Sequence, residues 1–536
     1  MANSLDPPSA TAQAELASDL DVLFVGAGVS TSYTLLSMLD ELRRNPADRP
    51  VRIAVIEQAS DLYGGQAYGL RSGYTSLLIT SLKDFLPEAP RALFAAWLSK
   101  NKSWAFEKFR QSGGNLSAKW WERNNKAVDE DLWEDLYLPR YLFGLYMAES
   151  VQDSIADAEA AGLITQTTFQ DEVATIRRRD ASYHVVGRHT GMTAHARNVV
   201  LAVGSGPTIS RFGASPSSDG SEFGATCLIE DLYVPSVRIN LDRVQRAVRQ
   251  CGDRKINVLI VGGNASTMEA LYILNDTGVP ELDEARFYIL SPSLSLPERL
   301  VDPTPSACFA PNTLLELPAH TELTARSVYE AALRDLAAGK NAGLTVSDTL
   351  APISRAVVSI LRLLPREEQL AFAGHWGAEL GRHQRRAGNE YADVVTSLMA
   401  QGRLELVAGK FLEVSGIDAA GAVFRYEDEG GARDFERRMT VIVNCSGFRP
   451  LHELSEESLL DNMVRHGTCR PTQWGRGIVV NDDMEANDGL FVMGPLLAGN
   501  VIGGFPVWHV EHCGRISSFS ATLGGTLAAR VAAPLQ

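Results

Sequence analysis

The chain has few cysteines, and no two of them stand at the spacing of a redox or metal motif. Its six cysteines are scattered over 536 residues, without any Cys-x-x-Cys pair. This pattern argues against a zinc site and excludes a dithiol of the thioredoxin-reductase type. The N-terminal stretch lacks a basic and an apolar segment, and no apolar run approaches the about 20 residues of a membrane span. We therefore expect a cytoplasmic protein with free thiols and no membrane partner.

Positive charge is scarce as well. The chain carries 50 Lys and Arg residues against 65 Asp and Glu residues, which gives a net charge of -15. A nucleic-acid partner is not expected, because proteins that bind the phosphate backbone present a basic face. A chain of 536 residues exceeds what one hydrophobic core supports, so we expect two or three domains.

Two stretches of the chain follow the pattern of a strand, a glycine turn and a helix. The first starts with an apolar run at 21–25, passes through Gly26 and Gly28 into a helical stretch, and closes with an apolar run that ends on Glu57. Gly26 permits the tight bend, and Gly28 lets a pyrophosphate approach the backbone at the positive end of the helix. This β-α-β unit predicts a dinucleotide site rather than a turn used for packing alone.

Four further residues belong to this first site. Ser30 lies at the start of the helix, and Glu57 is placed to accept hydrogen bonds from ribose hydroxyls. Thr31 stands where such turns have a third glycine, and we expect it to loosen the packing of helix on strand without abolishing the site. Gly494, in a glycine-rich stretch near the C-terminus, is assigned to the same cofactor site.

The second unit has a less regular turn after the apolar run 256–261. Gly262 and Gly263 open it, Ser266 follows, and Asn264 occupies the place of the middle glycine. Asn tolerates left-handed backbone better than other non-glycine residues, so we expect the turn to survive and to bind a nicotinamide nucleotide. The alternative is a degenerate domain with a structural role only.

The sequence gives only weak evidence on whether the nicotinamide nucleotide is NADPH or NADH. No acid follows the strand that ends at Leu290 to take a ribose 2′-hydroxyl. Ser291, Ser293 and Arg299 are instead suited to a 2′-phosphate. The sequence therefore favours NADPH, with NADH as the alternative.

These patterns predict an α/β fold with two Rossmann-like dinucleotide-binding domains, one for FAD and one for NAD(P). The FAD-binding domain is expected to be discontinuous, and both domains to carry helical insertions. We also expect a homo-oligomer. The expected division is a disordered leader at 1–18, the first part of the FAD-binding domain at 19–250 with a helical insertion at 61–174, the NAD(P)-binding domain with its insertion at 251–405, and the return to the FAD-binding domain at 406–536.

Several motifs, in order along residues 21–530, resemble those of the N-hydroxylating flavin monooxygenases. Residues 63–69 are similar to the flavin-proximal loop of that family, and residues 137–146 to its Pro-Arg-x-x-aromatic helix start. Ser266 and Glu269 fall in register with its Gly-x-Ser-Ala-x-Glu pattern. The resemblance implies the same two-domain fold and the same cofactors.

The chain also departs from the ornithine and lysine enzymes of that family. Residues 301–312 lack the Phe-x-Asn-Glu tetrad that grips the substrate, and residues 505–519 replace the terminal His-Gly segment. Both departures speak against ornithine or lysine as the substrate. Residues 374–388 look closer to a less characterised branch that includes aspartate N-oxygenases. The basic residues of that stretch form either an anionic-substrate site or an exposed helix face: Arg382, His383, Arg385 and Arg386.

The resemblance implies a reaction in which NAD(P)H reduces FAD and O₂ is captured as a C4a-(hydro)peroxyflavin. The amine of a small amino acid or amine is then oxygenated on nitrogen. The flavin carries the chemistry, so no protein nucleophile is required. Two alternatives stay open: an FAD-dependent oxidase or NAD(P)H:acceptor oxidoreductase on the same scaffold, and a non-catalytic flavin-binding protein.

The resemblance further makes Lys83 an anchor for a substrate carboxylate; the alternative is a surface lysine paired with Asp84. Gln66 is expected at the edge of the flavin ring; the alternative is a simple loop amide. His509 and His512, just before the final helix, are candidates for lining the substrate pocket or tuning protonation near neutral pH. Their alternative is a solvated or helix-capping role. No metal site is expected.

Overall fold

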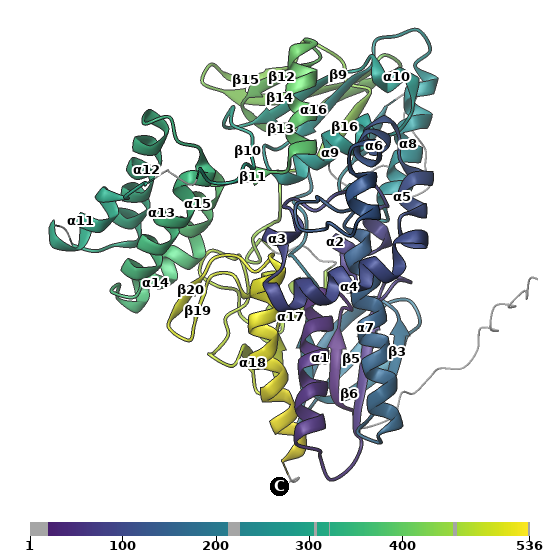
Figure 1. Ribbon diagram of the computed structural model, residues 1–536, viewed down its shortest axis with the longest axis vertical. Helices are drawn as coiled ribbons and strands as arrows, with labels where there is room; N and C mark the ends of the chain where they lie inside the picture. Colours follow the sequence, from purple (N-terminus) through teal and green to yellow (C-terminus); the bar gives the residue numbers. More distant parts are fainter. Residues whose placement is uncertain (1–19, 213–225, 305–307, 321, 454–457, 534–536) are drawn as a thin grey trace, which may run out of the picture.

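The computed structural model describes residues 20–212, 226–304, 308–320, 322–453 and 458–533. The leader expected at 1–18 lies outside these residues. Two largely parallel sheets, one in the lower and one in the upper part of Figure 1, are covered by helices. The predicted α/β fold with two Rossmann-like units is confirmed.

The first sheet has the order β17-β18-β6-β1-β2-β3, and β4 and β5 extend it from β6. Its centre is β1 (Leu20–Val25), which pairs in parallel with β2 (Val51–Glu57) and β6 (Thr193–Leu201). All six residues of β1 are buried, as in strands covered on both faces. Because β18 (Leu490–Val492) comes from the C-terminal part of the chain, the unit is discontinuous, as predicted. The remaining strands are β3 (Ile164–Gln170), β4 (Val173–Arg179), β5 (Ser182–Gly187) and β17 (Glu485–Asn487).

The second sheet has the order β12-β9-β8-β16-β7, and all of its pairs are parallel. The predicted second β-α-β unit forms its centre, with helix α9 (Ala265–Asn275) following β8 (Asn257–Val261). A small antiparallel sheet, β13-β14-β15, packs beside it. The other strands of both sheets are β7 (Cys227–Ile229), β9 (Arg286–Ser291), β12 (Leu404–Ala408), β13 (Lys410–Asp418), β14 (Gly421–Asp428), β15 (Gly431–Asp434) and β16 (Val441–Asn444).

Strand pairing differs from the predicted domain division at three places. β7 and β16 lie outside 251–405, yet both belong to the second sheet. β3 lies inside the expected insertion 61–174, yet it pairs with β2 in the first sheet. The sequence of a short apolar run predicts a strand, but it does not show which sheet that strand joins. We propose that the second unit spans 227–444 and that the first insertion ends at the end of α7, at 160.

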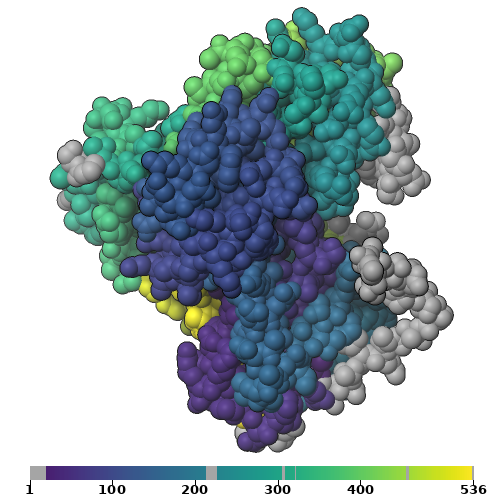
Figure 2. All heavy atoms as spheres, turned by 45° about the vertical axis from the view of Figure 1, so that its right-hand side comes forward, coloured from purple at the N-terminus to yellow at the C-terminus, as the bar shows by residue number. Residues whose placement is uncertain are grey.

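Two helical insertions surround these sheets. The first spans α2 to α7 and occupies the middle of the face in Figure 2 (dark blue), between the two units. The second forms the lobe at the left of Figure 1, with its own buried apolar cluster. Among the described residues, no helix is both long and apolar enough to cross a membrane. The first insertion contains α2 (Gly65–Tyr68), α3 (Leu82–Phe85), α4 (Glu88–Ala105), α5 (Glu107–Ser112), α6 (Asn115–Asp129) and α7 (Tyr141–Ala160); the second contains α11 (Asn312–His320), α12 (Ala325–Asn341), α13 (Val346–Leu361), α14 (Arg366–Ala371) and α15 (Gly377–His383).

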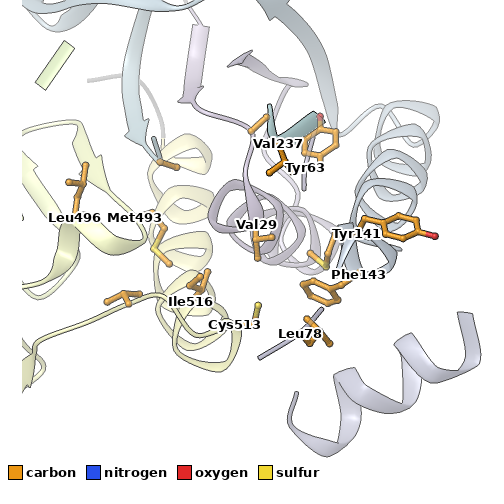
Figure 3. Close-up of a cluster of buried hydrophobic side chains, with 14 of the residues drawn as sticks. Val29, Tyr63, Leu78, Tyr141, Phe143, Val237, Met493, Leu496, Cys513 and Ile516 are labelled. Atoms are coloured by element: carbon orange, nitrogen blue, oxygen red, sulfur yellow. The ribbon is translucent and has the colours of Figure 1, made fainter. Parts of the chain in front are cut away.

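The C-terminal helix α18 (Cys513–Ala532) packs along α1 (Val29–Arg44), next to the first sheet. Figure 3 shows Val29 of α1, Phe143 of α7 and Ile516 of α18 in one buried cluster. Cys513 begins α18 in the same cluster and donates a hydrogen bond to the hydroxyl of Tyr68, 3.4 Å away. The final helix therefore brings its N-terminal end to the start of α1.

Candidate functional site

The first glycine turn joins β1 to α1 and requires glycine at Gly26 for two reasons. Gly26 has a φ of +94°, which L side chains rarely adopt. A Cβ there would lie 2.5 Å from the carbonyl oxygen of Ala202. The backbone N–H of Gly26 donates to the carbonyl of Ile56 at 2.8 Å, so the turn is fixed between the ends of three neighbouring strands.

Three segments meet at the N-terminus of α1. A Cβ on Gly65 would lie 2.8 Å from the Cα of Gly28, and a Cβ on Gly494 would lie 2.7 Å from Oγ of Ser30. The first turn of α1 carries no acidic residue, so the partial positive charge of the helix end is not offset there. The predicted residues Gly28, Ser30 and Gly494 therefore lie together, in a cradle of backbone that suits a pyrophosphate. Gln66 follows Gly65 at this cradle and is exposed.

Thr31 does not loosen the packing of α1, contrary to the expectation from sequence. Its side chain is fully buried, and its hydroxyl donates a hydrogen bond of 2.5 Å to the carbonyl of Gly26. The hydroxyl thus satisfies a carbonyl of the turn itself. The missing third glycine is replaced by a hydrogen bond that holds helix and turn together.

Glu57 ends β2 beside the turn. One carboxylate oxygen accepts the N–H of Ala27 at 2.8 Å, and the other accepts the N–H of Ala59 at 2.9 Å. The side chain is buried, with Arg71 at 4.0 Å. Each oxygen keeps a further lone pair, so a ribose contact is compatible with this arrangement and stays a prediction.

The second turn has the same backbone form as the first. Gly262 has a φ of +131°, and a Cβ there would collide with the carbonyl oxygen of Cys445. Asn264 has φ -107° and ψ -174°, close to the -89° and -174° of Gly28. The turn was expected to survive because Asn264 tolerates a left-handed backbone. That expectation is wrong, because the backbone of Asn264 is extended. Its side-chain oxygen accepts a hydrogen bond from Arg385.

The other predicted residues of this turn lie around it. A Cβ on Gly263 would lie 3.0 Å from Oγ of Ser291, so glycine is favoured there too. Ser266 is exposed on the first turn of α9, which again has no acidic residue. Both predicted glycines and Ser266 thus lie at the positive end of a helix.

The residues expected to receive a 2′-phosphate have partners within the protein. The hydroxyl of Ser291 donates to the carbonyl of Ser293. Arg299 pairs with Asp393 at 2.6 Å and bonds the side chain of Asn389 at 3.2 Å. The geometry at these residues thus adds no support for NADPH over NADH.

Lys83 lies at the junction of the first insertion with the second unit. Its ammonium group contacts the carboxylates of Asp135 at 2.8 Å and Asp302 at 3.1 Å, and these contacts raise its pKa. Asp84, the partner considered from sequence, instead accepts the hydroxyl of Ser81. Both partners of Lys83 are largely exposed, so each contact is weak and exchangeable.

His509 and His512 take different roles from each other. Burial, then the charges of Arg515, His512, Arg476 and Arg385, lower the pKa of His509 to about 3. This histidine is neutral near neutral pH, so tuning of protonation there is not supported. His512 is the N-cap of α18, and its Nδ1 accepts the N–H of Gly514 at 3.1 Å. The helix-capping alternative is confirmed for His512.

Sequence reasoning did not foresee a buried ion pair behind the second turn. Arg140, at the start of α7, forms two contacts of 2.6 and 2.9 Å with the carboxylate of Glu269 in α9. The guanidinium also lies over the ring of Tyr233, 5.4 Å from its centre. Both residues stand in motifs that carried the family resemblance, but their partnership needs the fold. The pair ties the first insertion to the helix of the second turn.

A family model described as FAD-NAD(P)-binding matches residues 23–206. An uncharacterised protein of Mycobacterium tuberculosis is 33% identical over 519 residues, which cover 95% of each chain. A protein of Mycobacterium bovis matches with the same values.

Solved structures share the fold over nearly the whole chain. They include a cadaverine monooxygenase of Erwinia amylovora described as bound to FAD, with a TM-score of 0.53, 12% identity and 97% of each chain covered. An ornithine N-hydroxylase of Kutzneria sp. 744 has a TM-score of 0.52 and 15% identity, and the match covers 96% of this chain and 99% of that one. An ornithine hydroxylase of Pseudomonas aeruginosa follows with a TM-score of 0.51, 12% identity and coverage of 95% and 99%.

Proposed function

Because this chain belongs to the FAD-NAD(P)-binding family, we propose that it is an NAD(P)H- and FAD-dependent monooxygenase that oxygenates the nitrogen of a small amine or amino acid. The carrying observation is the pair of glycine turns, built alike, at the start of α1 and of α9. Solved proteins named as ornithine and cadaverine oxygenases share this two-unit fold and support the reaction class.

The cysteines support an acceptor other than a disulfide. Five of the six cysteines, all but Cys308, are buried. Burial raises the pKa of the Cys445, Cys469 and Cys513 thiols to about 12, which suppresses the reactive thiolate. Electrons from the nicotinamide nucleotide therefore pass to a small molecule, for which O₂ is the proposed acceptor.

The chain's own residues fit the two cofactors. At the first turn the backbone of Gly26 and Gly28 and the end of α1 hold the FAD pyrophosphate, with Glu57 beside the ribose. Gly262 and the end of α9 hold the nicotinamide nucleotide in the same manner. When bound, the flavin supplies the electron transfer and the activation of O₂. The protein's role is to orient the two nucleotides.

Lys83 is the proposed anchor for the carboxylate of an amino-acid substrate. Its contacts with Asp135 and Asp302 place the ammonium group where the first insertion meets the second unit. Exposed carboxylates pair weakly, so a substrate carboxylate can replace one of them at small cost. The aspartate that is replaced at Lys83 is then available to pair with the substrate amine.

The proposal is tested by mixing the FAD-loaded protein with NADPH, first without and then with O₂. We expect the flavin absorbance to bleach anaerobically. In air, a screen of amino acids and short amines is expected to yield a product heavier by one oxygen atom. Hydrogen peroxide as the only product would support the oxidase alternative, and flavin that stays oxidised with both NADPH and NADH would support the non-catalytic one.

The anchor role of Lys83 has its own variant. Lys83→Ala is expected to raise the KM of the accepted substrate about 10-fold or more while FAD content stays at the wild-type level. Lys126→Ala is the matched control, because Lys126 is an exposed lysine of the same insertion that faces Glu130 at 3.8 Å. Loss of flavin from Lys83→Ala, with substrate KM unchanged, would refute the anchor role.

A further inference from the structure

Three arginines whose charges act on His509 have no carboxylate partner among the described residues. Arg385, Arg476 and Arg515 make no ion pair within 4.0 Å to any residue in the part of the chain that the structure describes. Arg385 and Arg515 are half-buried, and burial lowers the pKa of both, whereas Arg476 is exposed. A half-buried guanidinium without a carboxylate partner is costly, and such groups commonly bind an anion.

The acids that face this cluster do not neutralise it. Glu511 and Glu379 act on Arg385 and Arg476. Glu379, however, is already paired with Arg382 at 3.0 Å. Glu511 alone then offsets the charges of Arg385 and Arg476. An excess of positive charge at this point contrasts with the net charge of -15 of the whole chain.

Arg385 connects the cluster to the second glycine turn. Its guanidinium donates a hydrogen bond to the side-chain oxygen of Asn264, the N-cap of α9. Its carbonyl accepts the N–H of Glu298 at 3.1 Å, which fixes the backbone of Arg385 at the edge of the second unit. Burial lowers the pKa of Arg385, and the charges of Arg382 and Arg476 add to this effect.

We propose that Arg385 binds the pyrophosphate of the nicotinamide nucleotide at the second turn. A regular turn admits the phosphate to bare backbone at the middle glycine, whereas Asn264 puts a side chain there and holds a guanidinium beside it. A planar guanidinium binds two phosphate oxygens at once, which a lysine does not. This inference rests on the proposed use of NAD(P)H and adds a residue from the second insertion to that site.

The test is titration of NADP⁺ into the oxidised, FAD-loaded protein by calorimetry, which needs no turnover. Arg385→Ala is expected to weaken NADP⁺ binding about 10- to 100-fold, as for a lost hydrogen bond between charged groups. Arg385→Lys keeps the positive charge but lacks the planar guanidinium that binds two phosphate oxygens. It is therefore expected to recover only part of the affinity for NADP⁺. The matched control is Arg326→Ala, which removes an exposed arginine of the same insertion paired with Glu330.

The outcomes separate this inference from the proposed function. Flavin content and melting temperature are measured on every variant to identify any that misfold. If Arg385→Ala misfolds, the NADP⁺ affinity of Arg385→Lys decides the test. If wild type binds NADP⁺ and both Arg385 variants bind it equally well, the inference is overturned and the function stands. A raised substrate KM at unchanged NADP⁺ affinity would assign the cluster to a substrate carboxylate and also overturn it. If the FAD-loaded wild type neither binds NADP⁺ nor is reduced by NADPH or NADH, both fail.

Discussion

At the scale of single residues, His509 shows how its surroundings set a charge. The ring is partly buried and faces Arg515, Arg476 and Arg385, and its pKa falls from 6.5 to about 3. In the unfolded chain the same ring is expected to take up a proton near its ordinary pKa. Between these two values, the unfolded state therefore binds more protons than the folded state.

The consequence is a loss of stability on the acid side. The contribution of His509 to the free energy of unfolding is fully present above pH 6.5. It falls as the pH is lowered toward 3 and does not change below that value. His509→Gln removes the proton uptake, so its melting temperature is expected to fall less steeply over this window, a difference worth about 1 kcal/mol or more. Parallel curves of melting temperature against pH for the variant and wild type would contradict this account.

The roles of single residues were predictable from sequence where the backbone alone decides them. Gly26 and Gly262 need positive φ, and the strand-turn-helix pattern locates both. The expectations for Thr31 and Asn264 were wrong, because both residues were treated only as unfavourable replacements for glycine. Their actual partners, the carbonyl of Gly26 and the guanidinium of Arg385, depend on distances that the pattern does not contain.

At the scale of elements, the contact of α1 with α18 depends on one small residue. A Cβ on Gly524 would lie 2.6 Å from the Cβ of Ser37 in α1. One helical turn earlier, the hydroxyl of Thr34 donates to Ser520 at 3.1 Å. The two helices therefore approach each other closely near the middle of each.

Gly524→Ala is expected to lower the free energy of unfolding by about 1–3 kcal/mol, because the added methyl group overpacks the helix contact. Gly525→Ala is the matched control at the next position, where a Cβ meets no atom within 4 Å. Alanine should there stabilise the helix by up to about 1 kcal/mol. Denaturant unfolding of both FAD-loaded variants gives the comparison. Equal shifts of both midpoints in the same direction would show that the close contact does not matter.

The elements that the sequence located correctly are those with strong periodicity and clear ends. Both β-α-β units and the final helix are of this kind. β7 and β16, with three and four residues, lie outside the range predicted for the second unit but pair in its sheet, because their neighbours lie far along the chain. Pairing of distant strands is a property of the folded chain, and local pattern does not encode it.

At the scale of the whole molecule, the first insertion holds the two units together. Leu77, near its start, exchanges backbone hydrogen bonds of 2.9 Å with the hydroxyl of Tyr391 near the second sheet. Arg140 and Glu269 add a two-contact ion pair in which both side chains are nearly buried. These contacts set the relation of α9, and so of the second turn, to the first unit. In the proposed reaction, the transfer of electrons between the two nucleotides depends on that relation.

The ion pair is tested by a cycle of variants rather than by one substitution. Arg140→Met leaves the carboxylate of Glu269 buried without a partner and is expected to lower the free energy of unfolding by about 3–5 kcal/mol. The double variant with Glu269→Leu removes both charges, so it should lose less than the sum of the two single variants. Denaturant unfolding followed by flavin fluorescence measures all four proteins. Additive losses would mean that Arg140 and Glu269 stabilise their own units separately, and that the two units are held together by other contacts of the insertion.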